Sequence, residues 1–281
     1  MKLLNGKELA DKIKDEVKEE VEQMVANGHN VSLAVIQVGT DPASSTYVKN
    51  KKNACEYCGI KSITYKMDET VPEEELIELI NALNELNYVN GILVQLPLPK
   101  HINEHKVIQA IASEKDVDGF NESNVGRLMI GENTFVPCTT KGIIELLERN
   151  GIKIEGTNCV VVGRSNIVGK PTAIEMLHHN ATVTMCHSKT NGLKEICKNA
   201  DILICAIGKP KFFNKEYVKE GAIVIDVGIH RTENGLCGDV DFDDVKDIVS
   251  AITPVPRGCG AMTVAMLMKN CVQAAKLQQG W

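Results

Sequence analysis

The sequence has no apolar run that approaches the ~20 residues of a membrane-spanning helix, and it has no long basic run. With 31 Lys and Arg against 37 Asp and Glu, the formal net charge is −6, which argues against a nucleic-acid partner. Residues 1–8 lead into a charged amphipathic helix and lack the apolar core of a secretory signal. We therefore expect a cytoplasmic protein without a membrane or nucleic-acid partner.

The ten cysteines lack the spacing of a metal site. Cys55 and Cys58 form a C-x-x-C pair, and no second pair follows at zinc spacing. An incidental helical pair is therefore favoured over a redox or metal role. Cys159, Cys186 and Cys205 lie in apolar strand patterns and are interpreted as small core residues. We expect no bound metal and a reducing compartment.

Strands alternate with helices in both halves of the 281 residues, without an internal repeat or a low-complexity linker. This pattern predicts two α/β domains with mainly parallel sheets, over 1–139 and 140–260. A C-terminal helix, within 261–281, is expected to return to the first domain. Thr70 and Glu73 resemble a capping box that opens an amphipathic helix. The expected strands are 31–38, 62–67, 91–95, 158–162, 181–186, 202–206, 223–227 and 250–252.

The most informative segment runs from Val160 to Pro171, where an apolar strand enters a glycine loop and then a helix. Gly163 would let the backbone turn tightly and approach a pyrophosphate, and the helix N-terminus would offer free N–H groups. The match to the dinucleotide fingerprint is imperfect, because Ser165 replaces the second glycine and Gly169 is displaced. The segment predicts a Rossmann-type domain, with a plain strand-turn-helix connection as the alternative.

The turn after the strand 181–186 indicates which dinucleotide would bind. An acidic residue there would hold the ribose 2′-hydroxyl of NAD, but the chain reads His187-Ser-Lys-Thr190. Arg164 also lies on the glycine loop. Because cationic and hydroxyl groups suit a 2′-phosphate, we expect NADP. The alternative is a solvated polar turn.

The first half contains a second cluster of candidate residues. Tyr47 and Lys51 are four apart and share one helix face. Gln95 ends a strand, where open α/β sheets place ligand-binding groups, and Asp116 and Asp118 lie in a glycine-containing loop. Singly, each has an ordinary explanation as a solvated lysine, a strand-end amide or a loop carboxylate. Only their combination points to a site.

A set of motifs, in order and spread over nearly the whole chain, makes the combination specific. They resemble those of the bifunctional methylenetetrahydrofolate dehydrogenase/cyclohydrolase family. This resemblance implies NADP-dependent oxidation of 5,10-methylenetetrahydrofolate, hydrolysis of the methenyl product to 10-formyltetrahydrofolate, and a homodimer joined through the NADP-binding domains. The motifs are Tyr47-Val-Lys-Asn-Lys51, residues 91–99, Lys115-Asp-Val-Asp-Gly-Phe120, 124–128, 137–139, 163–171, 187–190 and 253–256.

The resemblance also implies roles for the substrate side. Lys51 matches the family's catalytic lysine, and Tyr47 matches a tyrosine that packs along the folate. Gln95 matches the glutamine that hydrogen-bonds the lysine. Asp118 matches the carboxylate that holds the pterin. These four residues are the expected catalytic and substrate-binding groups.

On the cofactor side, Arg164 and Ser188 match residues at the 2′-phosphate of NADP. Gly163 and Ser165 match the phosphate loop, and Ile229 matches a backbone contact to the nicotinamide end.

The sequence departs from the family pattern in two places. Thr140 replaces a proline, and because Thr can open a helix as proline can, this change is expected to be harmless. Residues 257–263 read Arg-Gly-Cys-Gly-Ala-Met-Thr, where the family usually has Gly-Gly-Val-Gly-Pro-Met-Thr. Arg257 would either point to solvent or bind the glutamate tail of the folate.

Two other functions remain open. The chain could be a monofunctional NADP-dependent dehydrogenase or a non-catalytic folate- or nucleotide-binding regulator. The presence of Lys51 and Gln95 favours the bifunctional enzyme over both.

Overall fold

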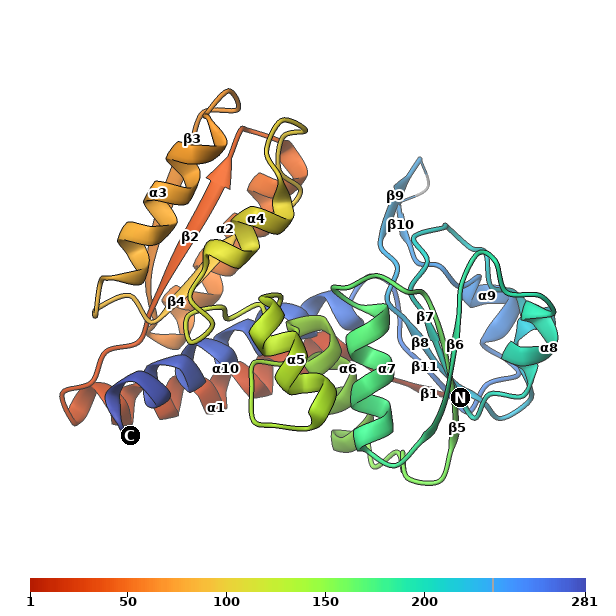
Figure 1. Ribbon diagram of the computed structural model, residues 1–281. Helices are drawn as coiled ribbons and strands as arrows, with labels where there is room; N and C mark the ends of the chain where they lie inside the picture. The colour runs from red at the N-terminus through yellow and green to blue at the C-terminus, as the bar shows by residue number, and fades with distance from the viewer. Residues whose placement is uncertain (234) are drawn as a thin grey trace. The chain divides into compact units, whose positions relative to one another are not determined.

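The computed structural model describes residues 1–233 and 235–281 (Figure 1). It divides into two compact units. We call residues 11–136 with 264–281 the lysine unit, and residues 1–10 with 137–263 the glycine-loop unit. Each has a parallel sheet with helices packed on it, so the predicted α/β class with two parallel-sheet units is confirmed. Within the described ranges, no helix is long and apolar enough to cross a membrane.

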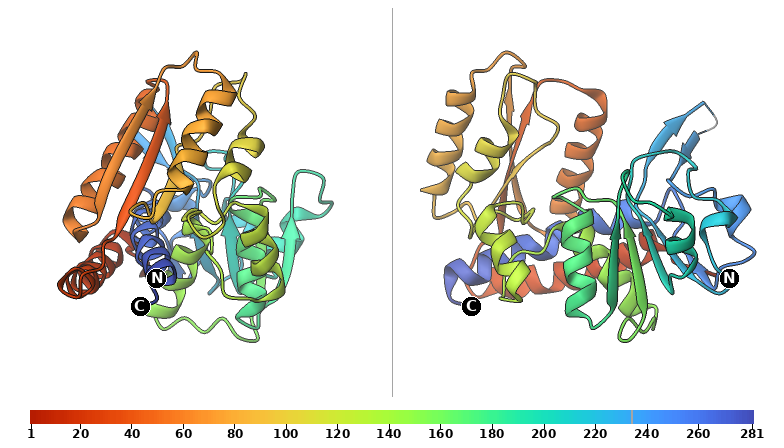
Figure 2. Two further views of the ribbon diagram at one scale, coloured as in Figure 1. Left: turned by 60° about the vertical axis from the view of Figure 1, so that its left-hand side comes forward. Right: turned by 45° about the vertical axis from the view of Figure 1, so that its right-hand side comes forward.

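The lysine unit is built on a three-stranded parallel sheet in the order β3-β2-β4. The central strand β2 is almost wholly apolar and is buried along its whole length, as expected for a strand covered on both faces. Helices α3 and α4 cover one face, and α2 lies on the other (Figure 2). The elements are β2 (Ser32–Val38), α2 (Pro42–Cys58), β3 (Lys61–Met67), α3 (Glu73–Asn84), β4 (Gly91–Val94), α4 (Glu104–Ala110) and α5 (Glu122–Ile130).

The expected capping box at the start of α3 is wrong. Pro72 occupies the N-cap and offers no side-chain acceptor to the helix. The hydroxyl of Thr70 donates to Asp68 Oδ1 (2.7 Å). The carboxylate of Glu73 accepts instead from Lys106 Nζ (3.0 Å) and from the Asn103 backbone. The helix is held by its apolar face, which is formed by Leu76, Ile80 and Leu83.

The glycine-loop unit contains a six-stranded parallel sheet in the order β1-β11-β8-β7-β5-β6. The chain leaves β5 toward one edge through β6 and toward the other through β7, so the strand order reverses at β5, as in Rossmann folds. The elements are β1 (Lys2–Leu3), α6 (Cys138–Arg149), β5 (Asn158–Val162), α7 (Gly169–His178), β6 (Thr182–Cys186), α8 (Leu193–Lys198), β7 (Ile202–Cys205), a 3₁₀ turn (Lys215–Tyr217), β8 (Ile223–Asp226), β9 (His230–Thr232), β10 (Gly235–Cys237), α9 (Phe242–Val245) and β11 (Ala251–Ile252).

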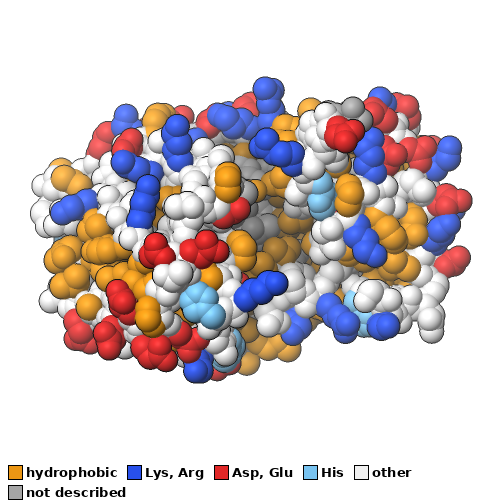
Figure 3. All heavy atoms as spheres, turned by 90° about the horizontal axis from the view of Figure 1, so that it is seen from above, with side chains coloured by type: hydrophobic (Ala, Val, Ile, Leu, Met, Phe, Trp, Pro, Cys, Tyr) orange, Lys and Arg blue, Asp and Glu red, His pale blue; other side chains and the backbone are white. Residues whose placement is uncertain are grey.

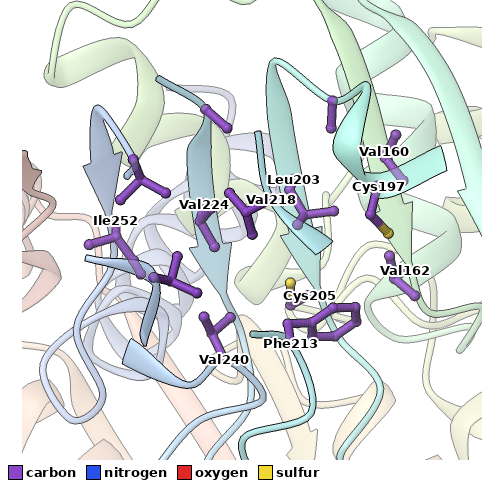
Figure 4. Close-up of a cluster of buried hydrophobic side chains, with 14 of the residues drawn as sticks. Val160, Val162, Cys197, Leu203, Cys205, Phe213, Val218, Val224, Val240 and Ile252 are labelled. Atoms are coloured by element: carbon purple, nitrogen blue, oxygen red, sulfur yellow. The ribbon is translucent and has the colours of Figure 1, made fainter. Parts of the chain in front are cut away.

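One face of this sheet carries a continuous apolar core (Figure 4). Leu203 and Val224, on neighbouring strands, lie beside Phe213, which is fully buried. Cys186 and Cys205 belong to this core, and the buried Cys159 lies on β5 as the apolar pattern predicts. These thiols fill space as small apolar groups.

The cysteine pair Cys55 and Cys58 lies on α2 and is also buried. Burial is the main reason that the pKa of the Cys55 thiol rises to about 12 and that of Cys58 to about 11. Both side chains are therefore neutral near pH 7 and unsuited to thiolate chemistry.

Two long helices each supply residues to both units, namely α1 (Gly6–Ala26) and α10 (Cys259–Gln279). The C-terminal part of α10 belongs to the lysine unit, in line with the expected C-terminal helix. The first ten residues group with the glycine-loop unit, because β1 pairs in parallel with β11. Basic and acidic side chains are interspersed over the face seen in Figure 3.

Candidate functional site

In the lysine unit, the side chains of Lys51 and Gln95 meet as the sequence suggests. Lys51 Nζ donates to Gln95 Oε1 (3.1 Å), and Tyr47, 44% exposed, lies one turn earlier on α2. Gln95 directly follows β4, and its backbone N–H donates to the Ile36 carbonyl (2.9 Å). Its side-chain Nε2 donates to the Leu96 carbonyl (2.6 Å), which leaves Oε1 turned to the ammonium. The glutamine thus orients Lys51 without adding a charge.

The start of the helix that carries Lys51 is fixed by its capping residues. Asp41 caps it by accepting from the Ser44 backbone N–H (2.7 Å), and Pro42 occupies its first position. Proline is favoured there because its fixed φ suits a helix and its missing N–H costs no bond. The cap fixes the start of α2 and hence the face that bears Tyr47 and Lys51.

The two loop carboxylates behave differently. Asp116 is 1% exposed and shapes its own loop. Its Oδ2 accepts from the Asn121 N–H (2.7 Å) and Asn124 Nδ2 (2.9 Å), and its Oδ1 accepts from the Gly119 N–H (3.2 Å). Asp118 is half-buried in the same loop. Asp116 is therefore engaged by its own chain, and binding of a ligand by Asp118 stays a prediction.

Lys115, to which sequence reasoning gave no role, anchors this loop. Its Nζ donates to three carbonyls at the end of α3, those of Leu83 (3.2 Å), Asn84 (2.6 Å) and Leu86 (3.0 Å). A cation at a helix C-terminus is favoured by the exposed carbonyl dipoles. The Lys115 backbone carbonyl accepts from the Ile92 N–H (2.8 Å), which places the segment that begins at Lys115 beside β4. The signal available in the sequence was that Lys115 is the first residue of the motif 115–120.

In the glycine-loop unit, the turn after β5 admits only glycine at two positions. Gly163 has φ +143°, and a Cβ there would overlap with the Ala206 carbonyl. A Cβ at Gly169 would overlap with the Gly163 carbonyl. The displaced glycine of the fingerprint therefore packs on the first one. Such a bare backbone surface fits the close approach of a pyrophosphate.

Ser165, which replaces the second glycine of the fingerprint, stabilises the turn through its side chain. Its Oγ accepts from the backbone N–H groups of Val168 and Gly169 (3.2 Å each), at the start of α7. The Lys170 N–H donates to the Ser165 carbonyl (3.0 Å). The serine thus fixes the turn that leads into the helix.

The expected phosphate-binding residues lie on two neighbouring loops. Val162 of β5 is paired in parallel with Cys186 of β6, so both strands end at one edge. Arg164 and Ser188 follow these ends and are exposed. Ile229 follows the end of β8, with 43% of its surface exposed. The structure thus puts the three candidates at the carboxyl edge of one sheet, where nucleotides bind in this fold class.

Thr140, at the first departure from the family pattern, does not open a helix. It is the third residue of α6, whose N-cap is Pro137, so the expectation that Thr140 opens the helix is wrong. Its hydroxyl is fully buried and lies 2.9 Å from Thr172 Oγ1 of α7. A hydrogen bond between two helices replaces the expected cap.

Arg257, at the second departure, has φ +82° and an exposed side chain. Left-handed backbone is where glycine is favoured and where an L-residue is strained. This gives a backbone reason for the glycine usual in the family. Binding of a glutamate tail by Arg257 stays a prediction.

Fold and site together define a two-domain α/β protein with a Rossmann-type nucleotide-binding unit. The family model described as tetrahydrofolate dehydrogenase/cyclohydrolase, catalytic domain, matches residues 4–118. The model for the NAD(P)-binding domain of the same family matches residues 137–279. The chain belongs to the tetrahydrofolate dehydrogenase/cyclohydrolase family.

Individual relatives are similar in sequence and structure to this protein over nearly their whole length. The bifunctional protein FolD of Lachnoclostridium phytofermentans is 62% identical over 275 residues, which cover 98% of each chain. The crystal structure of the bifunctional enzyme FolD from Campylobacter jejuni is similar with a TM-score of 0.97, 49% identity and 99% of each chain covered. The structure of the Trypanosoma brucei enzyme, solved with NADP and an inhibitor, is similar with a TM-score of 0.93 and 37% sequence identity. The match covers 98% of this chain and 97% of that one.

The strained backbone at Arg257 leads to a stability prediction. We expect Arg257→Gly to keep or raise the free energy of unfolding, because relief of a left-handed residue is worth about 1–2 kcal/mol and outweighs the added freedom of the unfolded glycine, about 0.4–1 kcal/mol. Arg257→Val should lower it, since a β-branched residue is crowded there. Arg257→Ala removes the exposed side chain beyond Cβ but keeps the left-handed strain, and should stay near wild type. Urea unfolding measures all three, and a glycine variant that is the least stable would contradict the argument.

Proposed function

We propose that this protein oxidises 5,10-methylenetetrahydrofolate with NADP⁺ and hydrolyses the methenyl product to 10-formyltetrahydrofolate. The observation that carries the proposal is the 3.1 Å bond between Lys51 Nζ and Gln95 Oε1. It lies within the region matched by the family's catalytic-domain model. The family relatives described above as bifunctional support both activities.

The two units take different parts in this function. We assign folate binding to the lysine unit and NADP binding to the glycine-loop unit. The bare backbone at Gly163 and Gly169 fits a dinucleotide phosphate, and the relative from Trypanosoma brucei was solved with NADP. Gly163 and Ser165 would hold the pyrophosphate, Arg164 and Ser188 the 2′-phosphate, and Ile229 the nicotinamide end. When bound, NADP⁺ supplies the acceptor for the hydride.

The oxidation needs little from the protein beyond orientation. In the substrate one carbon bridges two nitrogens, so loss of hydride gives a cation that both nitrogens already stabilise. Tyr47 would pack along the folate, and Asp118 would accept from the N–H and amino donors of the pterin in a charge-assisted pair. Holding the reacting carbon in one place removes most of the entropic barrier.

The hydrolysis needs a group that manages a proton. Water adds to the methenyl carbon and loses one proton, which gives a neutral carbinolamine. The bond from that carbon to N5 then breaks as N5 takes up a proton, and the hydroxyl loses its proton to become the formyl oxygen, so that one proton is released overall. We assign these transfers to Lys51, which donates to Gln95. Whether it accepts the proton or supplies positive charge and position is a question that its variants address.

The resemblance further supports a homodimer joined through the glycine-loop unit, and a cytoplasmic location for folate chemistry. Sedimentation at several protein concentrations tests the first of these. A protein that stays monomeric throughout would exclude it.

Replacing Lys51 tests the hydrolytic step. Lys51→Met keeps most of the aliphatic stem, and we expect hydrolysis of methenyltetrahydrofolate to fall by roughly 10²–10⁴-fold, the usual contribution of general acid–base groups. The decay of methenyl absorbance measures it. Lys52→Met removes an exposed neighbouring ammonium and should leave the rate unchanged. A wild-type rate in Lys51→Met would mean that another group moves the proton.

Substitution of the two carboxylates in the 115–119 loop should affect folate binding and protein stability separately. Asp118→Asn places an amide donor against pterin donors, so folate binding should weaken by on the order of 2 kcal/mol while the free energy of unfolding changes little. Asp116→Asn disturbs a buried acceptor of three hydrogen bonds and should lower the unfolding free energy by about 1–3 kcal/mol. Calorimetric titration and urea unfolding give the two quantities. Unchanged folate affinity in Asp118→Asn would transfer the pterin role to Asp116.

Replacing the two residues proposed for the 2′-phosphate tests cofactor choice. The double substitution Arg164→Ala with Ser188→Ala should weaken NADP binding and leave NAD binding nearly unchanged, because only NADP carries the 2′-phosphate. Dissociation constants for both cofactors give the comparison. Equal losses would show that the pair supports the loop and does not recognise the phosphate.

A further inference from the structure

Asp239, a fully buried carboxylate that follows β10, is surrounded by the loop that follows β7. Its Oδ2 accepts from the backbone N–H groups of Ile207 (2.7 Å) and Gly208 (3.0 Å), and its Oδ1 accepts from that of Lys209 (2.9 Å). Three consecutive N–H groups thus converge on one side chain. Such an arrangement satisfies the loop backbone and fixes its shape.

A second loop is tied to the same carboxylate. His230 Nε2 lies 2.8 Å from Asp239 Oδ1, and His230, the first residue of β9, directly follows Ile229 of the loop after β8. Because a carboxylate oxygen accepts this bond, Nε2 is the protonated nitrogen. Its imidazole is half-buried, with 19% of the side chain exposed. One carboxylate therefore joins the loops after β7 and β8.

Asp239 is itself placed by a second buried carboxylate. Asp226, the last residue of β8, accepts from the N–H groups of Gly228 (3.0 Å), Asp239 (2.9 Å) and Val240 (2.9 Å). A Cβ at Gly228 would overlap with the Asp239 carboxylate, and one at Gly238 with that of Asp226. The segment is thus packed at backbone contact and has little freedom to shift.

The two tied loops lie at the edge where the cofactor is proposed to bind. β7 and β8 are parallel neighbours, with Cys205 opposite Asp226. The loop after β7 begins at Ala206, whose carbonyl meets Gly163 of the phosphate loop. The loop after β8 holds Ile229, the expected backbone contact of the nicotinamide end. In this fold class ligands bind beyond the carboxyl ends of the strands, beside the point of strand reversal.

We infer that Asp239 and His230 form a positioning pair, which holds the backbone of residues 206–209 and 228–230 in the shape required by the nicotinamide end of NADP. The inference rests on the proposed function. Neither side chain is assigned contact with the cofactor. The pair acts through the main chain on the dehydrogenase reaction, whereas the Lys51–Gln95 group for hydrolysis lies in the other unit.

The two activities of one protein provide the test. In His230→Ala, NADP-dependent oxidation should fall at least tenfold in kcat/KM for NADP⁺, while hydrolysis of methenyltetrahydrofolate stays within twofold of wild type. His230→Gln, whose amide N–H can reach the carboxylate, should restore part of the loss. Arg231→Ala, the next position along β9 and exposed, serves as the matched control. Asp239→Asn is the stronger variant, because an amide would face three N–H groups.

The outcomes separate the inference from the proposed function. If wild-type protein does not oxidise methylenetetrahydrofolate with NADP⁺, the proposed function fails. If the wild type is active and His230→Ala oxidises at the wild-type rate, the positioning role is wrong. Equal loss of oxidation and hydrolysis, together with a lower midpoint of thermal unfolding, would make the pair a general stabiliser and would also overturn the inference.

Discussion

The close approach of three main-chain segments at Gly163 is the constraint on which the cofactor side depends. The loop after β5 touches the Ala206 carbonyl on one side and the start of α7 at Gly169 on the other. Any side chain at these glycines would separate the segments, and the helix N-terminus would no longer point at the place left for a phosphate. The sheet order makes this point the reversal of the strands, so the same contact defines where a nucleotide can lie.

Buried charged side chains then fix the loops that the sheets leave unpaired. Asp116 in one unit and Asp226 and Asp239 in the other each accept several backbone N–H groups, and Lys115 donates to three carbonyls. Burial is the main cause that raises the pKa of both Asp116 and Asp226 to about 6. The cost of placing such groups in the interior is offset because the loop backbone would otherwise lack partners.

Much of the fold follows from the sequence, because buried parallel strands read as apolar runs and the long helices carry one apolar face. The short strands β1, β9 and β10 could not be predicted, since two or three residues carry no periodicity. Their pairing depends on partners far along the chain. The helix α5 was not anticipated as an element either, although part of it was recognised as a motif.

The candidate site was predictable to a different degree in its two halves. Lys51 and Gln95 are 44 positions apart, and it was the resemblance of their motifs to the family that implied their hydrogen bond. The loop-shaping task of Asp116 could not be read from a side chain identical to that of Asp118, because hydrogen bonds from Asn121 and Asn124 define it. Asp239 gave no signal, since most of its partners are main-chain groups, which have no sequence signature.

The division of chemistry explains why one unit relies on its backbone and the other on its side chains. Hydride acceptance belongs to the nicotinamide, so the glycine-loop unit has mainly to hold a shape, which its glycines and the carboxylates that bind its main chain provide, while Arg164 and Ser188 are proposed for the 2′-phosphate alone. Water addition and ring opening move protons, and main-chain amides are too weakly acidic and basic to serve as general acids or bases near neutral pH. The lysine unit accordingly holds Lys51 on α2 in hydrogen-bond contact with Gln95, which directly follows β4. Substitutions at the buried carboxylates of the first unit should act through geometry, and those at Lys51 through chemistry.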